Sequence, residues 1–355
     1  MRGDLAVLLM VGIMLVNRDA AAGGLRKVWS VSIPDVTTSS RSVATAPAEV
    51  FSVAFSPDGR RLAATVGPSG AESVLIFNVR APQSPPVRFA ANVQGEKTSF
   101  STALMWSSSG NYLLVGHRLV NLSDGRSCSI PDLAFAHLVS DPPKVVAKQL
   151  ARPRRLITFD VGCSVVAEVD LGQDLWNILD VSPDTDTLLL WWQHYQGPAR
   201  VSWDLSVSAA RSGDVLRRLP LLEKARFLDR GNMVCGIYGP RWHQTIKCLD
   251  ARSGEPLGNT REWTAPQIQA ARNAKRAIVT DYSRKFDFID WVWTTGSIKR
   301  HVIWDFAARM ELGSLHPNTQ KTNWGSIPFP VAISPNGEDV LEGGGGVLTL
   351  YHVEQ

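Results

Sequence analysis

The sequence has no apolar stretch long enough to form a transmembrane helix. Its longest apolar run covers residues 5–16, whereas a helix that crosses a bilayer needs about 20 such residues. Arg2 precedes this run and the small residues Ala20 to Ala22 follow it, which is the pattern of a secretory signal before its cleavage site. We therefore expect residues 1–22 to be a signal peptide, and the mature protein to be periplasmic or secreted with no membrane span. The alternative is an uncleaved N-terminal anchor.

The chain also has little net charge and no metal-binding spacing. Its 37 Lys and Arg against 33 Asp and Glu give a net charge of +4, which is too small to indicate a nucleic-acid partner. The four cysteines lack CxxC or Cys/His zinc spacing, and the seven histidines show no ligand pattern. His137 is expected on an inner strand as a packed or channel-lining residue. We expect no metal and no cofactor.

Familiar catalytic motifs are missing as well. The sequence contains no nucleophile elbow, zincin motif, P-loop, dinucleotide fingerprint or EF-hand loop. The glycine run 343–346 lacks the Lys-Ser/Thr pair and the helix that a phosphate loop needs, so it is interpreted as a hairpin turn. No catalytic residue is predicted, although groups that converge from distant segments would leave no local motif.

Turn-forming residues, in contrast, are abundant along the whole chain. The 28 Gly and 21 Pro among 355 residues argue against a helix bundle. The hydrophobic content of 44% and the low net charge argue against disorder. Length alone suggests two domains of about 150 residues, although single all-β domains can be longer.

Two marks alternate along the sequence. The first is a turn of the Ser-Pro-Asp-Gly type between β-rich runs, in which Pro sets φ, Asp bonds to the backbone and Gly takes positive φ. It occurs clearly at 56–59 and 334–337 and in weaker form at 107–110, 140–142, 182–184, 229–231 and 271–274. The second mark is an apolar or aromatic residue followed by Asp, Asn or His. It occurs at Phe77-Asn78, Val120-Asn121, Phe159-Asp160, Trp203-Asp204, Leu249-Asp250, Trp304-Asp305 and Tyr351-His352.

Seven repeats of this length predict an all-β fold. The second mark recurs at spacings of 43, 39, 44, 46, 55 and 47 residues, which is the period of a four-stranded propeller blade. We therefore expect one domain over residues 23–355, a seven-bladed β-propeller of four-stranded antiparallel blades. The chain stops after the third strand of blade seven, at 348–353. We expect the strand-like segment 27–33 to complete that blade and to close a monomeric ring.

On these residues, the chain resembles the WD-repeat β-propeller family. Trp203-Asp204 and Trp304-Asp305 match the dipeptide of that family, and the Ser-Pro-Asp-Gly turns match its first hairpin. The Gly-His pair between blades is missing, since Gly116-His117 lies elsewhere, and related bacterial propellers with looser repeats remain an alternative. The resemblance implies a role in protein–protein interaction.

One disulfide is expected from hairpin register. If Gly239 faces Gln244, then Cys235 lies opposite Cys248, within the reach of a disulfide; the alternative is two free buried thiols. Cys128 and Cys163 are expected on outer strands of different blades, and so they are not expected to pair.

The twelve tryptophans suggest a ligand-binding face. Five have structural positions in strands, namely Trp29, Trp106, Trp176, Trp203 and Trp304. The others fall near loops of blades four to seven that open on one face, and aromatic loops on a rigid scaffold commonly build a binding site. The predicted face comprises Trp191, Trp192, His194, Tyr195, Arg241, Trp242, His243, Trp263, Trp291, Trp293 and Trp324, with Arg261 and Lys321 as polar neighbours.

Blade six should contribute a long hairpin over residues 283–300. Either it projects as an aromatic and basic finger, or it folds back and buries its tryptophans between blades. The favoured function is a non-catalytic binding or scaffold protein for a protein, peptide or glycan. The alternative is a propeller enzyme, such as a lyase, a lactone hydrolase or a quinoprotein-like dehydrogenase subunit, with its site at the central channel.

Overall fold

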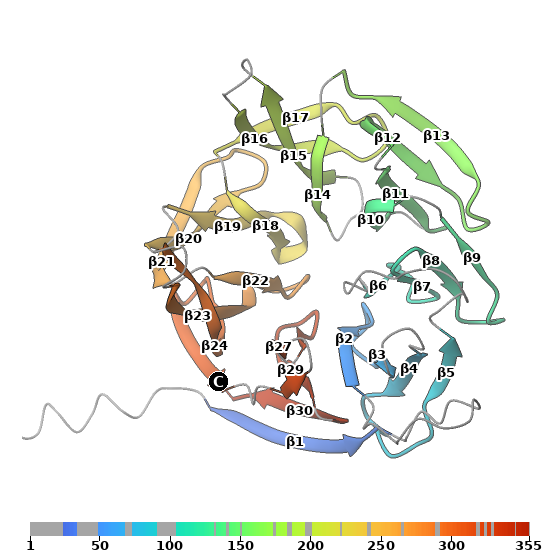
Figure 1. The fold of residues 1–355 in the computed structure, drawn as a ribbon, viewed down its shortest axis with the longest axis vertical. Helices are drawn as coiled ribbons and strands as arrows, with labels where there is room; N and C mark the ends of the chain where they lie inside the picture. The colour runs from blue at the N-terminus through green and yellow to red at the C-terminus, as the bar shows by residue number, and fades with distance from the viewer. Residues whose placement is uncertain are drawn as a thin grey trace, which may run out of the picture.

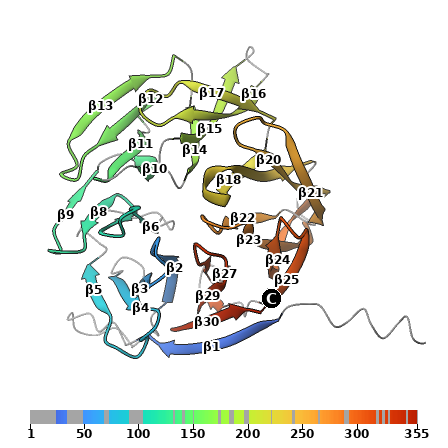
Figure 2. The ribbon, with the colours of Figure 1, turned by 180° about the vertical axis from the view of Figure 1, so that it is seen from behind.

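Seven four-stranded antiparallel sheets are arranged as blades around one axis (Figures 1 and 2). This computed structural model describes residues 24–33, 49–67, 73–90, 104–130, 133–139, 142–149, 151–172, 175–182, 187–195, 201–220, 222–239, 243–263, 266–287, 292–316, 320–322, 325–327, 330–344 and 346–354. The all-β, seven-bladed propeller expected from the repeat is thereby confirmed.

In each blade we call the strands a to d, from the ring axis outwards. Blade one has β2 (Glu49–Phe55), β3 (Arg61–Gly67), β4 (Ser73–Asn78) and β5 (Val87–Ala90). Blade two has β6 (Leu104–Trp106), β7 (Tyr112–Val115), β8 (Arg118–Asn121) and β9 (Ser127–Ser129). Blade three has β10 (Leu133–Val139), β11 (Lys144–Gln149), β12 (Arg152–Phe159) and β13 (Val165–Asp170).

The remaining blades follow the same order. Blade four has β14 (Leu175–Val181), β15 (Thr187–Tyr195), β16 (Val201–Ala209) and β17 (Val215–Leu219). Blade five has β18 (Glu223–Leu228), the 3-10 turn η1 (Asp229–Gly231), β19 (Met233–Tyr238), β20 (Gln244–Asp250) and β21 (Pro256–Trp263). Blade six has β22 (Gln267–Ala270), β23 (Arg276–Asp287), β24 (Val292–Asp305) and β25 (Met310–Leu315).

Blade seven joins the two ends of the chain. It consists of β28 (Val331–Ile333), β29 (Asp339–Gly344), β30 (Val347–Val353) and β1 (Leu25–Ser32). The register of β1 on β30 runs from Leu25 opposite Val353 to Ser32 opposite Val347, and the two strands lie side by side in Figure 1. The expected closing strand is confirmed. A small hairpin, β26 (Gln320–Thr322) and β27 (Gly325–Ile327), precedes this blade.

The core is divided among the interfaces between blades. Each of seven apolar clusters in the described residues combines side chains from two neighbouring blades. The cluster across the seam includes Leu348 and Leu350 of blade seven together with Leu62 and Phe77 of blade one. Ring closure is therefore needed to bury blade one as well as blade seven.

Buried serines hold the a–b turns, which explains the first sequence mark. Ser56, Ser107 and Ser334 are at most 2% exposed. Each hydroxyl accepts the backbone N–H that opens strand b, with distances of 2.9, 3.0 and 2.9 Å. The turn glycines, such as Gly59 with φ 69°, take the left-handed conformation that the pattern predicts.

The second mark forms the c–d turns. The side chains of five of these residues accept the backbone N–H two positions further on, and they are Asn78, Asn121, Asp160, Asp250 and Asp305. This is the Asx-turn geometry that favours Asn and Asp at such positions.

Trp203-Asp204 does not occupy this position, so its match to the family dipeptide is misleading. The pair lies near the start of β16, and the c–d turn of blade four follows Ala209, whose carbonyl accepts the N–H of Gly213 at 2.9 Å. Asp204 instead forms an ion pair with Arg218 at 2.7 Å. Only Trp304-Asp305 combines the dipeptide with the turn position.

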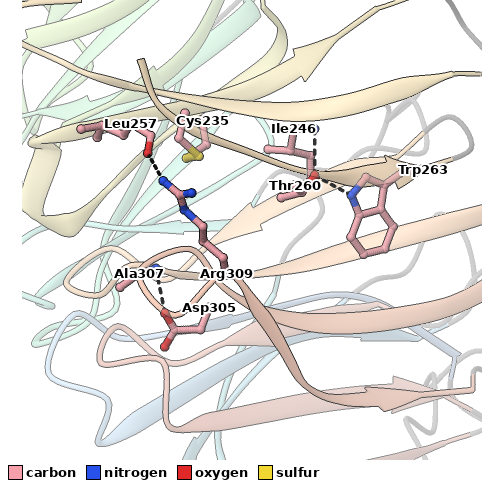
Figure 3. Close-up of a disulfide and its surroundings, with 9 residues drawn as sticks. Cys235, Ile246, Leu257, Thr260, Trp263, Asp305, Ala307 and Arg309 are labelled. Carbon is pink, nitrogen blue, oxygen red and sulfur yellow. Dashed lines mark hydrogen bonds between the residues drawn. A yellow bond between two sulfur atoms is a disulfide. The ribbon is translucent and has the colours of Figure 1, made fainter. Parts of the chain in front are cut away.

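Both pairs of cysteines form disulfides. Cys235 and Cys248 are directly opposed on β19 and β20, with Cα atoms 4.1 Å apart; Figure 3 shows the surroundings of this bridge. Cys128 and Cys163 are also bridged, with Cα atoms 5.9 Å apart, so the expectation that they stay unpaired is wrong. Cys128 is on the outer strand of blade two, while Cys163 lies in the c–d turn of blade three, where neighbouring blades meet at the rim.

Candidate functional site

Much of the predicted aromatic face lies outside the described residues. This applies to Arg241, Trp242, Trp291 and Trp324 as whole residues, and to the side chains of His194, Tyr195 and Trp293. Their part in a binding face stays a prediction. The other four members can be placed.

Two of these four belong to the core rather than to the surface. Trp192 is 1% exposed and its Nε1 donates to the Ser206 hydroxyl at 2.7 Å, between blades three and four. Trp263 is 3% exposed and its Nε1 donates to the Thr260 hydroxyl at 2.8 Å (Figure 3). Trp192 packs against blade three and Trp263 against blade six, so neither ring offers its face to a ligand.

Arg261 stabilises the packing of Trp263. Its guanidinium lies 4.5 Å from the centre of the Trp263 ring and 5.7 Å from that of Trp304, and it pairs with Glu311 at 3.0 Å. A cation between two aromatic rings and a carboxylate binds blade five to blade six. Arg261 is therefore a structural residue rather than a polar neighbour of a ligand.

Trp191 and His243 remain closer to the surface. Trp191 is half-buried and packs on Trp203 with ring centres 5.2 Å apart. His243 is exposed, with its Nδ1 3.4 Å from a carboxylate oxygen of Glu262. The blade-six hairpin is long, as expected, since β23 and β24 pair as far as Asp287 opposite Val292. Side chains 283–297 are not described, so the choice between finger and cover stays open.

The channel histidine has a packing role. His137 Nε2 lies 3.1 Å from the carbonyl oxygen of Ile178 on the next inner strand. Burial, aided by the positive charges of Arg226 and Arg272, lowers the pKa of His137 to about 4 against the opposing effect of Asp180. Asp180 accepts the N–H of Phe227 at 2.8 Å and Arg226 donates to the carbonyl of Leu179 at 2.6 Å. These polar groups link blades three, four and five.

A large groove lies at the ring closure. This closure groove has a volume of about 720 Å³ and runs between blade seven and blade one on the face formed by the a–b and c–d turns. We call this the turn face. The charged groups in its lining are Arg26, Asp58, Arg60, Arg80, Glu338, Asp339 and His352.

The charges of the closure groove are only partly paired. Asp339 contacts His352 at 2.9 Å. Burial raises the pKa of Asp58, but hydrogen bonds from Ser56 and the Arg60 N–H outweigh it and keep that pKa below its usual value. The guanidinium groups of Arg60 and Arg80 are exposed and donate to no acceptor among the described residues. Sequence reasoning missed this groove because its residues look like ordinary turn residues, and only ring closure brings 26, 60, 80 and 352 together.

Comparisons with known proteins support the fold alone. No family model and no curated protein sequence matches this chain. Among 784 matching chains of solved structures is the β-propeller domain of Cps50 (Swd1) from Myceliophteria thermophila. It shares 14% sequence identity at a TM-score of 0.57, over 93% of this chain and 99% of that one. The protein thus has a WD40-like, seven-bladed β-propeller fold. In the described part of the chain, no helix is long and apolar enough to cross a membrane.

Proposed function

We propose that this protein is an exported, non-catalytic binding scaffold for a protein, peptide or glycan partner. The closure groove carries this proposal. Its volume of about 720 Å³ lies within the range of about 300–1,000 Å³ that is usual for ligand sites. It combines the guanidinium groups of Arg60 and Arg80, which donate to no acceptor among the described residues, with carboxylates and an aromatic residue, Trp29. Charged groups of both signs on a rigid frame can give specificity to the recognition of a partner through electrostatic complementarity.

The two disulfides support export. All four cysteines of the chain are paired, and disulfides persist in oxidising compartments but are rare in the cytosol. This chemistry agrees with the signal peptide expected at residues 1–22. Intact-mass and peptide mapping of the native protein without reductant should show both bridges and an N-terminus at Gly23. Free thiols in the native protein would contradict export.

The aromatic loops are a second candidate surface for binding the partner. They include the exposed His243 and those tryptophans that lie outside the described residues. Because His243 lies at the b–c end of blade five, whereas the closure groove is lined by a–b and c–d turns, substitutions can separate their contributions to binding.

Affinity capture from the extracytoplasmic fraction tests the function. The baits are the wild type, a closure-groove variant (Arg60→Gln with Arg80→Gln), an aromatic-face variant (His243→Gln) and a charge control (Lys27→Gln with Arg126→Gln). We expect a retained partner whose dissociation constant, measured with purified components, rises in at least one of the first two variants and not in the control. Equal retention by all four baits, or none above bare resin, would contradict the proposal.

A further inference from the structure

A second groove on the turn face is lined by arginines. This arginine groove, of about 270 Å³, lies between blades four and five. Arg217, Arg230 and Arg252 line it, and none of the described residues in its lining is acidic. A concave surface with three cations and no carboxylate attracts anions.

Each arginine is placed by a different element. Arg217 comes from β17, and its stem lies over the c–d turn of blade five, where a Cβ added to Gly254 would be 3.3 Å from the arginine Cδ. Arg252 follows β20 in that turn. The Asp250 carboxylate beside it accepts the N–H groups of Ser253 and Arg252, at 2.7 and 3.0 Å. The hydrogen bonds from Ser253 foremost, then the N–H of Arg252 and the positive charge of its guanidinium, lower the pKa of Asp250.

Arg230 reaches the groove from a strained turn. Asp229 and Arg230 have φ of 51° and 56°, in the left-handed region that non-glycine residues avoid. Blade six fixes this turn, because the N–H groups of Asp229 and Arg230 donate to the carbonyls of Ala274 and Arg272 at 3.0 and 2.8 Å. Lys275 pairs with the Asp229 carboxylate at 3.6 Å. Strain that the surroundings maintain is concentrated at functional sites.

Other arginines between blades have protein acceptors. Arg61 donates to the carbonyl of Gly110 at 2.6 Å, and Arg276 pairs with Asp305 at 3.1 Å. The guanidinium groups of Arg217, Arg230 and Arg252 donate to no acceptor among the described residues. All three side chains are exposed in the lining of the groove, so their donors are available to an anionic group.

The groove also has an apolar part. Val207, Leu216 and Ala251 contribute to its lining, and the Leu216 side chain is 58% exposed. The volume of about 270 Å³ is at the lower limit for small-molecule sites, about 300 Å³, and so fits one or two side chains of a larger partner. Arginine matches carboxylates with paired hydrogen bonds, and the exposed leucine matches an apolar side chain.

We propose that the arginine groove binds an acidic segment of a partner protein, in which Asp or Glu alternates with apolar residues. This inference rests on the proposed binding function and names the partner chemistry for one site. The site lies between blades four and five, away from the closure groove, so the two can be altered independently.

Fluorescence anisotropy with defined peptides tests the groove. The probes are a labelled Leu-Glu decapeptide and its Leu-Gln counterpart. We expect the wild type to prefer the Glu peptide, and the variant R217Q/R230Q/R252Q to lose roughly tenfold in affinity, since exposed ion pairs each contribute a factor of a few. A charge-matched control, K27Q/R126Q/K144Q, removes three exposed cations elsewhere and should change the affinity less than about threefold.

The variant Arg230→Gly tests whether misfolding, rather than loss of the arginine, explains a weaker affinity for the Glu peptide. Glycine accepts the left-handed turn, so this variant should melt at a higher temperature than the wild type and yet bind the Glu peptide more weakly. Unchanged affinity in Arg230→Gly, or in the triple variant, would overturn the proposal, as would an equal loss in the charge control.

Two competitors separate the sources of negative charge. Displacement of the Glu peptide by inorganic phosphate at low millimolar concentration, or by a heparin hexasaccharide at a lower concentration than unlabelled peptide, would overturn the peptide assignment. If a partner captured in the scaffold experiment binds the wild type and R217Q/R230Q/R252Q equally, the arginine groove is not its binding site, while the scaffold function still holds. If no partner is captured although the Glu peptide binds to the groove, the scaffold function is contradicted instead.

Discussion

The serine that opens each well-formed a–b turn is a buried polar residue with a defined partner. In blades one and seven, the hydroxyls of Ser56 and Ser334 accept the N–H groups of Arg61 and Asp339 at 2.9 Å. A substitution by alanine leaves a buried N–H without its acceptor. The penalty for such an unsatisfied group is about 1–3 kcal/mol.

We therefore expect Ser56→Ala and Ser334→Ala each to lower the free energy of unfolding by roughly 1–2 kcal/mol. Urea unfolding followed by tryptophan fluorescence measures this change. Ser84→Ala is the matched control, because Ser84 is exposed and its hydroxyl has no partner among the described residues; its effect should stay within about 0.5 kcal/mol. Equal losses in all three variants would show that the turn bond has no special role.

A second residue-scale effect concerns pH. His301 is 2% exposed, its Nδ1 lies 2.8 Å from the Thr280 hydroxyl, and burial lowers its pKa to about 4. The unfolded chain takes up this proton near pH 6.5, whereas the folded chain takes it up near pH 4. The unfolded state thus binds more protons in this window, and stability is lost as pH falls from about 6.5 to about 4.

His301→Gln removes this titration and can keep a hydrogen bond to Thr280. Between pH 7 and pH 4, this group alone should lower the free energy of unfolding of the wild type by on the order of 2–3 kcal/mol. The variant lacks this contribution, so its free energy of unfolding should fall by that much less. Unfolding free energies at a series of pH values provide the comparison. Parallel pH profiles for the two proteins would contradict this assignment.

At the scale of single elements, β1 has two different faces. Val31 packs against the apolar cluster across the seam, whereas Val28 on the same strand is 44% exposed. We expect Val31→Asp to lower the free energy of unfolding by about 2 kcal/mol or more, because it buries a charge where β1 meets Leu348. Val28→Asp, with the same change of charge, should cost less than about 0.5 kcal/mol. A similar cost for both variants would mean that β1 adds little to closure.

Elements and their order could be predicted because turn chemistry is local. Ser-Pro-Asp-Gly at 56–59 dictates a hairpin wherever it occurs, and the repeat period fixes the number of strands per blade. Local sequence was misleading at Trp203-Asp204. This pair matches the family dipeptide, but the c–d turn of blade four begins five residues further on. Blade four has long b and c strands, β15 and β16, so spacing alone misplaced its c–d turn.

The candidate sites could not be predicted in the same way, because they depend on contacts between blades. Trp192 and Trp263 were expected on a surface, but the side on which a strand residue packs is set by its neighbouring blade. The lining of the closure groove and that of the arginine groove come from segments far apart in sequence. Sequence patterns predict where turns occur, whereas the cavities between turns depend on how neighbouring blades are placed around the ring.

At the scale of the whole molecule, the two disulfides differ in what they join, since one lies within a blade and the other links two blades. Cys235–Cys248 joins two strands of one blade over a separation of 13 residues, while Cys128–Cys163 joins two blades over 35 residues. In the chain-entropy description, a longer closed loop constrains the unfolded chain more, and these separations correspond to about 3 and about 4 kcal/mol.

We expect Cys128→Ala with Cys163→Ala to lower the free energy of unfolding by more than Cys235→Ala with Cys248→Ala, by about 1 kcal/mol; alanine avoids placing hydroxyl groups at the buried positions 235 and 248. Neighbouring blades share their cores, so release of the inter-blade bridge should loosen the contact between blades two and three before the rest of the ring. Urea unfolding of both double variants gives the free energies, and hydrogen exchange locates the loosened strands, which should include β9 and the β12–β13 turn. A larger loss on removing the bridge within blade five, or exchange confined to β19 and β20 in both variants, would show that the ring is stabilised within its blades and not between them.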